Sequence, residues 1–178
     1  HGGVIGGSIS QGELKVGDEI EIRPGIKKSN KYIPLVTEVM SLFQSRTALD
    51  VAKPGGLIAV GTRLDPSLTK ADNLVGNLAG TVDSLPKVQE ECKIQITLLD
   101  KVLGAEEEIP VVPLKRGEPL LLVAKTTLTA GVIQKIGKKN TAHFKLKRPI
   151  CAEKGSIIAV SRIINRRYRL IGYGTLKS

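Results

Sequence analysis

The chain has 178 residues, of which 41% are hydrophobic and 25% charged, and it carries a formal net charge of +10. This length permits one domain or two of about 90 residues each. The composition is that of a folded globular protein whose core is rich in Val, Ile and Leu and poor in aromatic side chains. No apolar run approaches the roughly 18 residues that span a bilayer, and no signal-peptide pattern opens the chain, so we expect a soluble cytoplasmic protein.

The charge is unevenly distributed. Residues 1–86 hold nine Lys and Arg against nine Asp and Glu, whereas residues 87–178 hold eighteen against eight. This asymmetry favours two units and a polyanion as the partner of the second. Solubility, or a thermophile's preference for Lys and Glu, would explain the same excess.

Short β-branched runs recur every 8 to 12 residues or so between turn signals, a pattern typical of antiparallel barrels or sandwiches. We therefore predict an all-β fold. In the first half the expected strands are 3–9, 19–23, 33–43, 57–61 and 74–82. In the second half they are 91–99, 119–125, 130–136, 141–146, 156–162 and 169–176.

Three connecting segments have distinct patterns. Residues 26–31 are polar and basic, which predicts an exposed loop. Residues 65–70 place Asp before Pro, the order of an N-cap and a first helical residue, which predicts one short helical turn. Residues 81–88 are the best linker, because Pro86 cannot continue a central strand and the charge balance changes beyond it. The predicted domains are therefore 1–86 and 87–178.

The chain offers little for catalysis, so we expect no enzyme, no metal and no cofactor in these residues. Cys92 and Cys151 lie far apart and are interpreted as buried thiols. The two histidines, His1 and His143, have no evident acidic partner. A phosphate-binding G-x-x-x-x-G-K-[ST] motif is absent, and the acidic run 106–108 is typical of a solvated turn.

Basic side chains gather near the C-terminal end, at Arg162, Arg166, Arg167 and Arg169 around Tyr168. On a strand, Arg167 and Arg169 would share one face and could hold phosphates. An edge strand protected by charges is the alternative. With five aromatic residues in the chain, binding of a single strand by base stacking is disfavoured.

Several segments resemble the gamma subunit of archaeal-type translation initiation factor 2, beyond its GTPase domain. They are 2–9 and 15–25, the more specific block of 54–62 and 64–72, and then 98–104, 161–162 and 169–174. The resemblance implies two tandem β-barrels like domains two and three of elongation factor Tu, the second of them basic. Tyr168 stands where the family usually has tryptophan. The GTPase domain and the first strand of the first barrel would precede Gly2 in the family.

The resemblance implies non-catalytic barrels that help to bind methionyl initiator tRNA and the alpha subunit for delivery to the small ribosomal subunit. GTP and Mg²⁺ would belong to the intact factor's own GTPase domain, to which the beta subunit would also attach. Contact with the tRNA end is carried over to Gly6, Gly7, Gly61, Thr62, Arg63, Leu64, Asp65 and Lys70. Docking of the alpha subunit is expected at Ile26, Lys27, Lys28, Ser29 and Asn30. RNA-backbone contact is expected at Arg162, Arg166, Arg167 and Arg169.

Two other functions fit the pattern. The barrels could belong to another tRNA-delivering elongation factor, although the block 64–72 argues against it. The basic half alone would also suit a stand-alone RNA-binding or ribosomal protein, for which affinity for any duplex RNA should fall steeply with salt.

Overall fold

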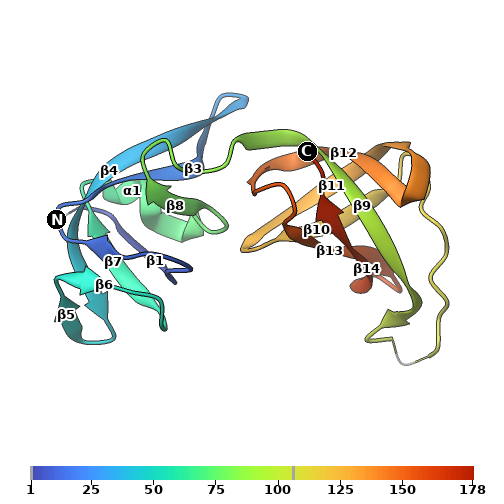
Figure 1. Cartoon of the computed structure of the whole chain (residues 1–178), viewed down its shortest axis with the longest axis horizontal. Coiled ribbons are helices and arrows are strands. Elements are labelled where there is room, and N and C mark those ends of the chain that lie inside the picture. Colours follow the sequence, from blue (N-terminus) through green and yellow to red (C-terminus); the bar gives the residue numbers. More distant parts are fainter. Residues whose placement is uncertain (1, 106) are drawn as a thin grey trace. The chain divides into compact units, whose positions relative to one another are not determined.

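The protein is described by a computed structural model that covers residues 2–105 and 107–178 (Figure 1). The chain divides into two compact units, the first ending at Leu85 and the second running from Pro86 to Ser178. Strands dominate both units, which confirms the all-β prediction. Each unit is described by itself.

In the first unit, a curled sheet has the strand order β1-β7-β4-β3-β8, with β5 added to β4, and β2 pairs separately with β6. The elements are β1 (Val4–Gly7), β2 (Leu14–Lys15), β3 (Glu19–Lys28), β4 (Lys31–Gln44), β5 (Thr47–Leu49), β6 (Val51–Ala52), β7 (Ile58–Thr62), α1 (Pro66–Thr69), η1 (Lys70–Asp72) and β8 (Leu78–Thr81). Within the described residues this sheet does not close, and β1 forms one of its edges.

The core of the first unit comes from alternating residues of its strands, as half-buried sheets require. Ile58 and Val60 of β7 point inward, where they meet Val39 and Leu42 of β4 and Ile20 of β3. The residues between them face outward. The positions of the outward residues decide which side chains a partner can reach.

Two predictions for the first unit are wrong in detail. Residues 26–31 are not an irregular loop, because β3 and β4 remain paired out to Lys28 and Lys31 around a turn in which Ser29 has φ +56°. The predicted strand 74–82 is shortened to β8, since residues 74–77 form turns that include Gly76 at φ +78°. The end of the β3–β4 hairpin protrudes beyond the core, so its residues do not alternate between buried and exposed sides. Its sequence therefore lacks the period of two that predicts a half-buried strand.

The second unit is a closed antiparallel barrel with the order β10-β11-β12-β9-β14-β13. Its elements are β9 (Val88–Leu103), β10 (Pro119–Ala124), β11 (Thr127–Ile136), η2 (Lys138–Asn140), β12 (Thr141–Cys151), β13 (Ile157–Ile164) and β14 (Arg167–Leu176). Buried aliphatic side chains and one ring, Phe144, fill its interior. Closure leaves the barrel without the free edges that an open sheet presents.

A β-bulge interrupts the pairing of β11 with β12. Ile133 lies opposite Phe144, but the next paired residue on β11 is Lys135, opposite His143. Gln134 is the extra residue, and both Gln134 and Lys135 are exposed. Bulges re-aim side chains in this way, and here the bulge gives the outer face of β11 two consecutive polar residues.

Candidate functional site

The residues predicted to contact a tRNA end form one continuous path along the edge of the first unit. Strand β1 pairs with β7 so that Val4 faces Gly61 and Gly6 faces Ala59. The path then follows β7 into the turn before α1. We call Gly6, Gly7, residues 61–65 and Lys70 the glycine–turn site. Its glycine pair and its turn lie at opposite ends of β7.

Thr62 holds the middle of the glycine–turn site in place. The side chain is buried, and its hydroxyl donates to the Gly3 carbonyl at 2.7 Å and accepts from the Leu64 N–H at 3.2 Å. Leu64 is buried beside it. Thr62 and Leu64 therefore position the turn, while a partner could reach only their exposed neighbours.

Those neighbours are charged. The Arg63 side chain is 64% exposed and its Nε lies 3.1 Å from Glu38 Oε2. Asp65 caps α1 by accepting the Ser67 N–H at 2.8 Å, which confirms the predicted helical turn. This hydrogen bond holds the pKa of the exposed Asp65 carboxyl below its ordinary value. Lys70 is exposed just after the turn.

Gly6 and Gly7 are unusual because no contact among the described residues explains why glycine stands at these positions. A Cβ added at Gly6 would meet its nearest atom, the Ile58 carbonyl oxygen, at 3.8 Å, and one at Gly7 would meet nothing within 4 Å. By contrast, a Cβ at Gly61 would meet the Ser41 hydroxyl at 2.3 Å. Gly6 and Gly7 also lack the positive φ that favours glycine. Glycine weakens a strand, so a reason outside the described residues is needed for this pair.

The residues predicted to dock the alpha subunit form the end of the β3–β4 hairpin, which we call the hairpin tip (Figure 1). Residues 27–30 are exposed and Ile26 is half-buried. Farther along β4, Ile33 and Val36 are 43% and 52% exposed. The hairpin tip thus combines lysines with nearby apolar side chains that have no cover in the first unit.

The four predicted RNA-binding arginines separate into two kinds. Arg162 has only 12% of its side chain exposed, and both Nε and Nη2 bond to the Glu118 carboxylate. Its Nη1 donates to the Val112 carbonyl at 3.0 Å. Arg162 therefore ties β13 to the segment before β10. Arg162 thus has a structural role. Its contact with RNA stays a prediction.

The other three arginines lie at the β13–β14 hairpin and are called the arginine hairpin. Asn165 and Arg166, with φ of +50° and +63°, form its two-residue turn, and Arg167 and Arg169 follow on β14. Arg167 and Arg169 line one hollow of about 320 Å³, together with Glu107, as the predicted shared face requires. A guanidinium pair beside a hollow suits a phosphate group.

Glu118 was not expected from the sequence, and neither was a second buried carboxylate, Glu21. Glu21 accepts from Arg23 Nε at 2.7 Å and from the Asp83 N–H at 3.0 Å, and Arg23 also donates to the Leu85 carbonyl at 2.8 Å. These bonds fix the end of the first unit to β3. The only signal for Glu21 in the sequence is its position between two isoleucines of a predicted strand, and this position does not indicate which residue it pairs with.

The two cysteines are both buried, which confirms their interpretation as buried thiols. Burial raises the pKa of the Cys92 thiol to about 12. Within the described residues, no group of three His, Cys, Asp or Glu side chains could hold a metal ion. His1 and Glu106 lie outside those residues, and His143 is half-buried on β12.

No helix in the part of the chain that the structure describes is long and apolar enough to cross a membrane.

Comparison with known proteins places these features in a family. Residues 2–73 match the family described as Elongation factor Tu domain 2, and residues 90–176 match Initiation factor eIF2 gamma, C terminal. The translation initiation factor 2 subunit gamma of Methanocaldococcus jannaschii is 52% identical over 99% of this chain and 44% of its own length. The same subunit of Thermococcus onnurineus is 49% identical over 99% of this chain and 44% of its own.

The chain thus spans less than half the length of these relatives. The agreement nevertheless covers both units, because one family matches most of the first unit and the other nearly all of the second. The expected likeness to elongation factor Tu in a fold of tandem β-units is also confirmed. The chain therefore belongs to the family of translation initiation factor 2 gamma subunits, of which it represents the C-terminal domains.

Proposed function

We propose that this chain is the non-catalytic, partner-holding part of a translation initiation factor. In this role the first unit contacts the end of methionyl initiator tRNA through the glycine–turn site, and it docks the alpha subunit through the hairpin tip. The arginine hairpin of the second unit contacts an RNA backbone. Together these surfaces help to deliver the tRNA to the small ribosomal subunit. GTP, Mg²⁺ and the beta subunit are assigned to the part of the relatives that this chain does not cover.

One observation carries the tRNA assignment. Gly6 and Gly7 are exposed, and within the described residues neither backbone conformation nor packing calls for glycine at these positions. A surface without side chains lets a ribose or an ester approach the backbone closely. The exposed Arg63 and Lys70, at the far end of β7, add positive charge along the same path. This combination fits the sugar and phosphate of a nucleic-acid end better than it fits a protein side chain.

The test is a Gly7→Val substitution in a complete gamma subunit that carries this segment. A Cβ at position 7 would meet no described atom within 4 Å, so we expect a valine there to block a partner without disturbing the fold. We expect affinity for methionyl initiator tRNA, measured with the alpha subunit and a non-hydrolysable GTP analogue, to fall about tenfold or more, the equivalent of roughly 1.4 kcal/mol.

The matched control is Gly137→Val in the second unit. Gly137 also has a negative φ, and a Cβ there would approach the Thr141 carbonyl oxygen no closer than 3.5 Å. The control should leave tRNA affinity unchanged. If Gly7→Val binds tRNA like the unmodified factor, the glycine–turn site is not the contact.

The alpha-subunit assignment is supported by the chemistry of the hairpin tip. Lysines at positions 27 and 28 protrude at its end, and Ile33 and Val36 remain exposed beside it. Apolar side chains next to a charged rim are typical of a surface that another folded protein covers. Charge reversal at Lys27 and Lys28 should therefore weaken the alpha subunit's binding while tRNA-end contact is retained.

A further inference from the structure

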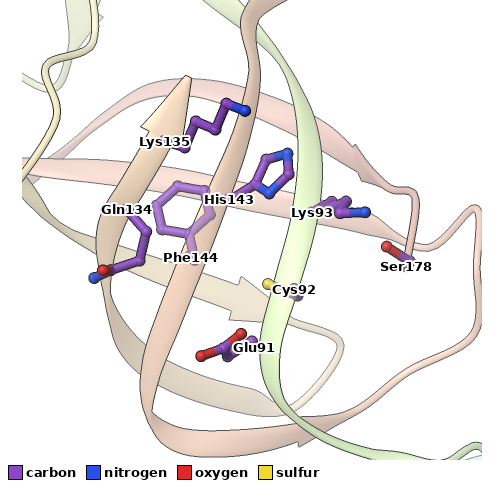
Figure 2. A pocket seen from close by; sticks show the side chains of 8 residues that line it. All are labelled: Glu91, Cys92, Lys93, Gln134, Lys135, His143, Phe144 and Ser178. Carbon is purple, nitrogen blue, oxygen red and sulfur yellow. The ribbon is translucent and has the colours of Figure 1, made fainter. Parts of the chain in front are cut away.

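Three basic side chains lie in a row across the outer face of the barrel. His143 of β12 pairs with Lys93 on β9 and with Lys135 on β11. Figure 2 shows Lys135, His143 and Lys93 following one another over these strands, around a hollow of about 400 Å³. Side chains directly opposite in an antiparallel pair lie about 5 Å apart, so one small ligand could reach all three. We call this set the basic row.

The β-bulge of β11 creates the basic row. With regular pairing, Gln134 would follow Ile133 opposite His143. The extra residue shifts Lys135 into that place and brings Ile136, in place of Lys135, opposite the buried Ala142. The bulge thus exchanges an amide for an ammonium beside His143, and it shifts the register by one residue so that an apolar side chain meets the core. Bulges at such places often serve to aim a functional side chain.

The lysines of the basic row flank His143 on either side, and their like charges repel each other. Among the described residues, no acidic side chain forms an ion pair with any of the three. The carboxylate that lines the hollow, Glu91, lies opposite Lys145 and not opposite His143. A bound anion would remove the repulsion that the chain itself leaves in place.

We propose that the basic row binds a phosphate group. Lysine ammonium groups and an imidazole N–H supply the donors that phosphate oxygens require. The phosphate could belong to an RNA backbone or be a free anion, since both present the same oxygens. The site is separate from the arginine hairpin, with which it shares no lining residue.

Charged side chains surround His143 on this face of the barrel. Lys93 and Glu91 face it from β9, Lys135 from β11 and Lys145 from its own strand. Beyond β14, Lys177 bonds through its N–H to the Lys93 carbonyl, and Ser178 lines the hollow. Basic side chains outnumber the one acidic side chain around His143, which favours an anion at this place.

The experiment titrates the chain with sodium sulfate and, separately, with a short RNA strand without a terminal phosphate. Binding is followed by NMR at the His143 ring and the Lys93 and Lys135 side chains. We expect saturable shifts at these side chains with at least one probe. Shifts with RNA alone identify a backbone site, and shifts with sulfate identify a site for a free anion as well.

Two substitutions distinguish a site from diffuse positive charge. Lys93→Gln and Lys135→Gln should each weaken binding about fivefold, the effect of one charge at contact distance. Lys125→Asn is the control, because it deletes the same charge at the opposite end of β11, about 30 Å away along an extended strand. The proposal is overturned if neither probe shifts the three side chains, or if Lys125→Asn weakens binding as much as Lys135→Gln.

Discussion

The two units of this chain are both all-β, but their surfaces differ in charge and in exposed apolar groups. The first has equal numbers of acidic and basic residues, exposed glycines on β1, and apolar side chains exposed along β4. The second carries the whole excess of positive charge. A basic surface suits a partner that is held by its phosphates. A neutral surface with exposed apolar side chains suits a partner that fits closely against it.

The contrast also holds inside the second unit, where similar arginines have different roles. Arg162 is enclosed and bonded to Glu118, whereas Arg166 and Arg167 are exposed at a hairpin turn. Burial decides between these roles, because an enclosed guanidinium needs a carboxylate and an exposed one is free to take a phosphate. Counting basic residues in a segment therefore overstates the charge that a polyanion can use.

The largest expected effect tests the difference between the enclosed Arg162 and the exposed arginines. Arg162→Ala would leave Glu118, 17% exposed, without its partner, and we expect the second unit to lose about 3 kcal/mol of stability. Urea denaturation followed by circular dichroism measures the loss. Arg166→Ala is the control, with a change of less than about 0.5 kcal/mol for an exposed residue. Equal losses from the two substitutions would remove the distinction between the arginines.

In the first unit the corresponding pair is Glu21 and Arg23. Glu21→Gln should lower the free energy of unfolding of the first unit by about 2 kcal/mol. The reason is that a buried carboxylate, which accepts two hydrogen bonds, is replaced by an amide whose single oxygen cannot accept both. The Arg23 bond holds the pKa of Glu21 below its ordinary value of 4.5. Glu21 thus stabilises the folded state fully above that pH, and its contribution is lost as the pH falls through the lowered value.

The measurement is the stability difference between the unmodified chain and Glu21→Gln as a function of pH. We expect a constant difference near neutrality that shrinks in acid. A difference that grows as the pH falls would mean that the pKa of Glu21 is raised in the folded state.

An intermediate effect concerns RNA. Replacing both Arg167 and Arg169 by Ala should weaken duplex RNA binding about tenfold and lower the slope of log affinity against log salt by about 2. The hollow that both side chains line is the reason for changing them together. Filter binding over a salt series tests this, with Gly7→Val as the variant that should leave the slope unchanged. An unaltered slope after the double substitution would assign the binding to other basic residues.

The smallest effect tests the glycine pair itself. Gly7→Ala should change the stability of the first unit by less than about 0.5 kcal/mol, since the added methyl group meets no atom within 4 Å. Gly61→Ala should instead be clearly destabilising, because its methyl group would clash with the Ser41 side chain. Thermal unfolding of both variants gives the comparison. A large loss of stability from Gly7→Ala would mean that the fold of the first unit itself requires glycine at position 7.

Local patterns explain which parts of the fold could be predicted. The Asp65–Pro66 turn depends on neighbouring residues alone and was found where expected. The strand predicted at 141–146 likewise lies within β12. Patterns of this kind can be predicted from the sequence because neighbouring residues of one turn or one strand determine them.

Pairings between distant segments could not be predicted in the same way. Arg162 and Glu118 are 44 positions apart, and neither the charge nor the spacing of either residue names the other. The basic row depends on a bulge that sets the register of β11 against β12, which one strand's sequence does not reveal. The hairpin tip was mistaken for a loop because its residues protrude beyond the core that would impose a period of two.

The central claim is that the first unit holds a protein partner through the hairpin tip. Its most direct test is a calorimetric titration of this chain, shown to be folded by circular dichroism, with the C-terminal domain of an archaeal alpha subunit. The account predicts saturable one-to-one binding that Lys27→Glu with Lys28→Glu abolishes and Lys93→Glu in the second unit leaves intact. A folded chain that binds no alpha subunit, or that loses binding only with the second-unit substitution, would contradict it.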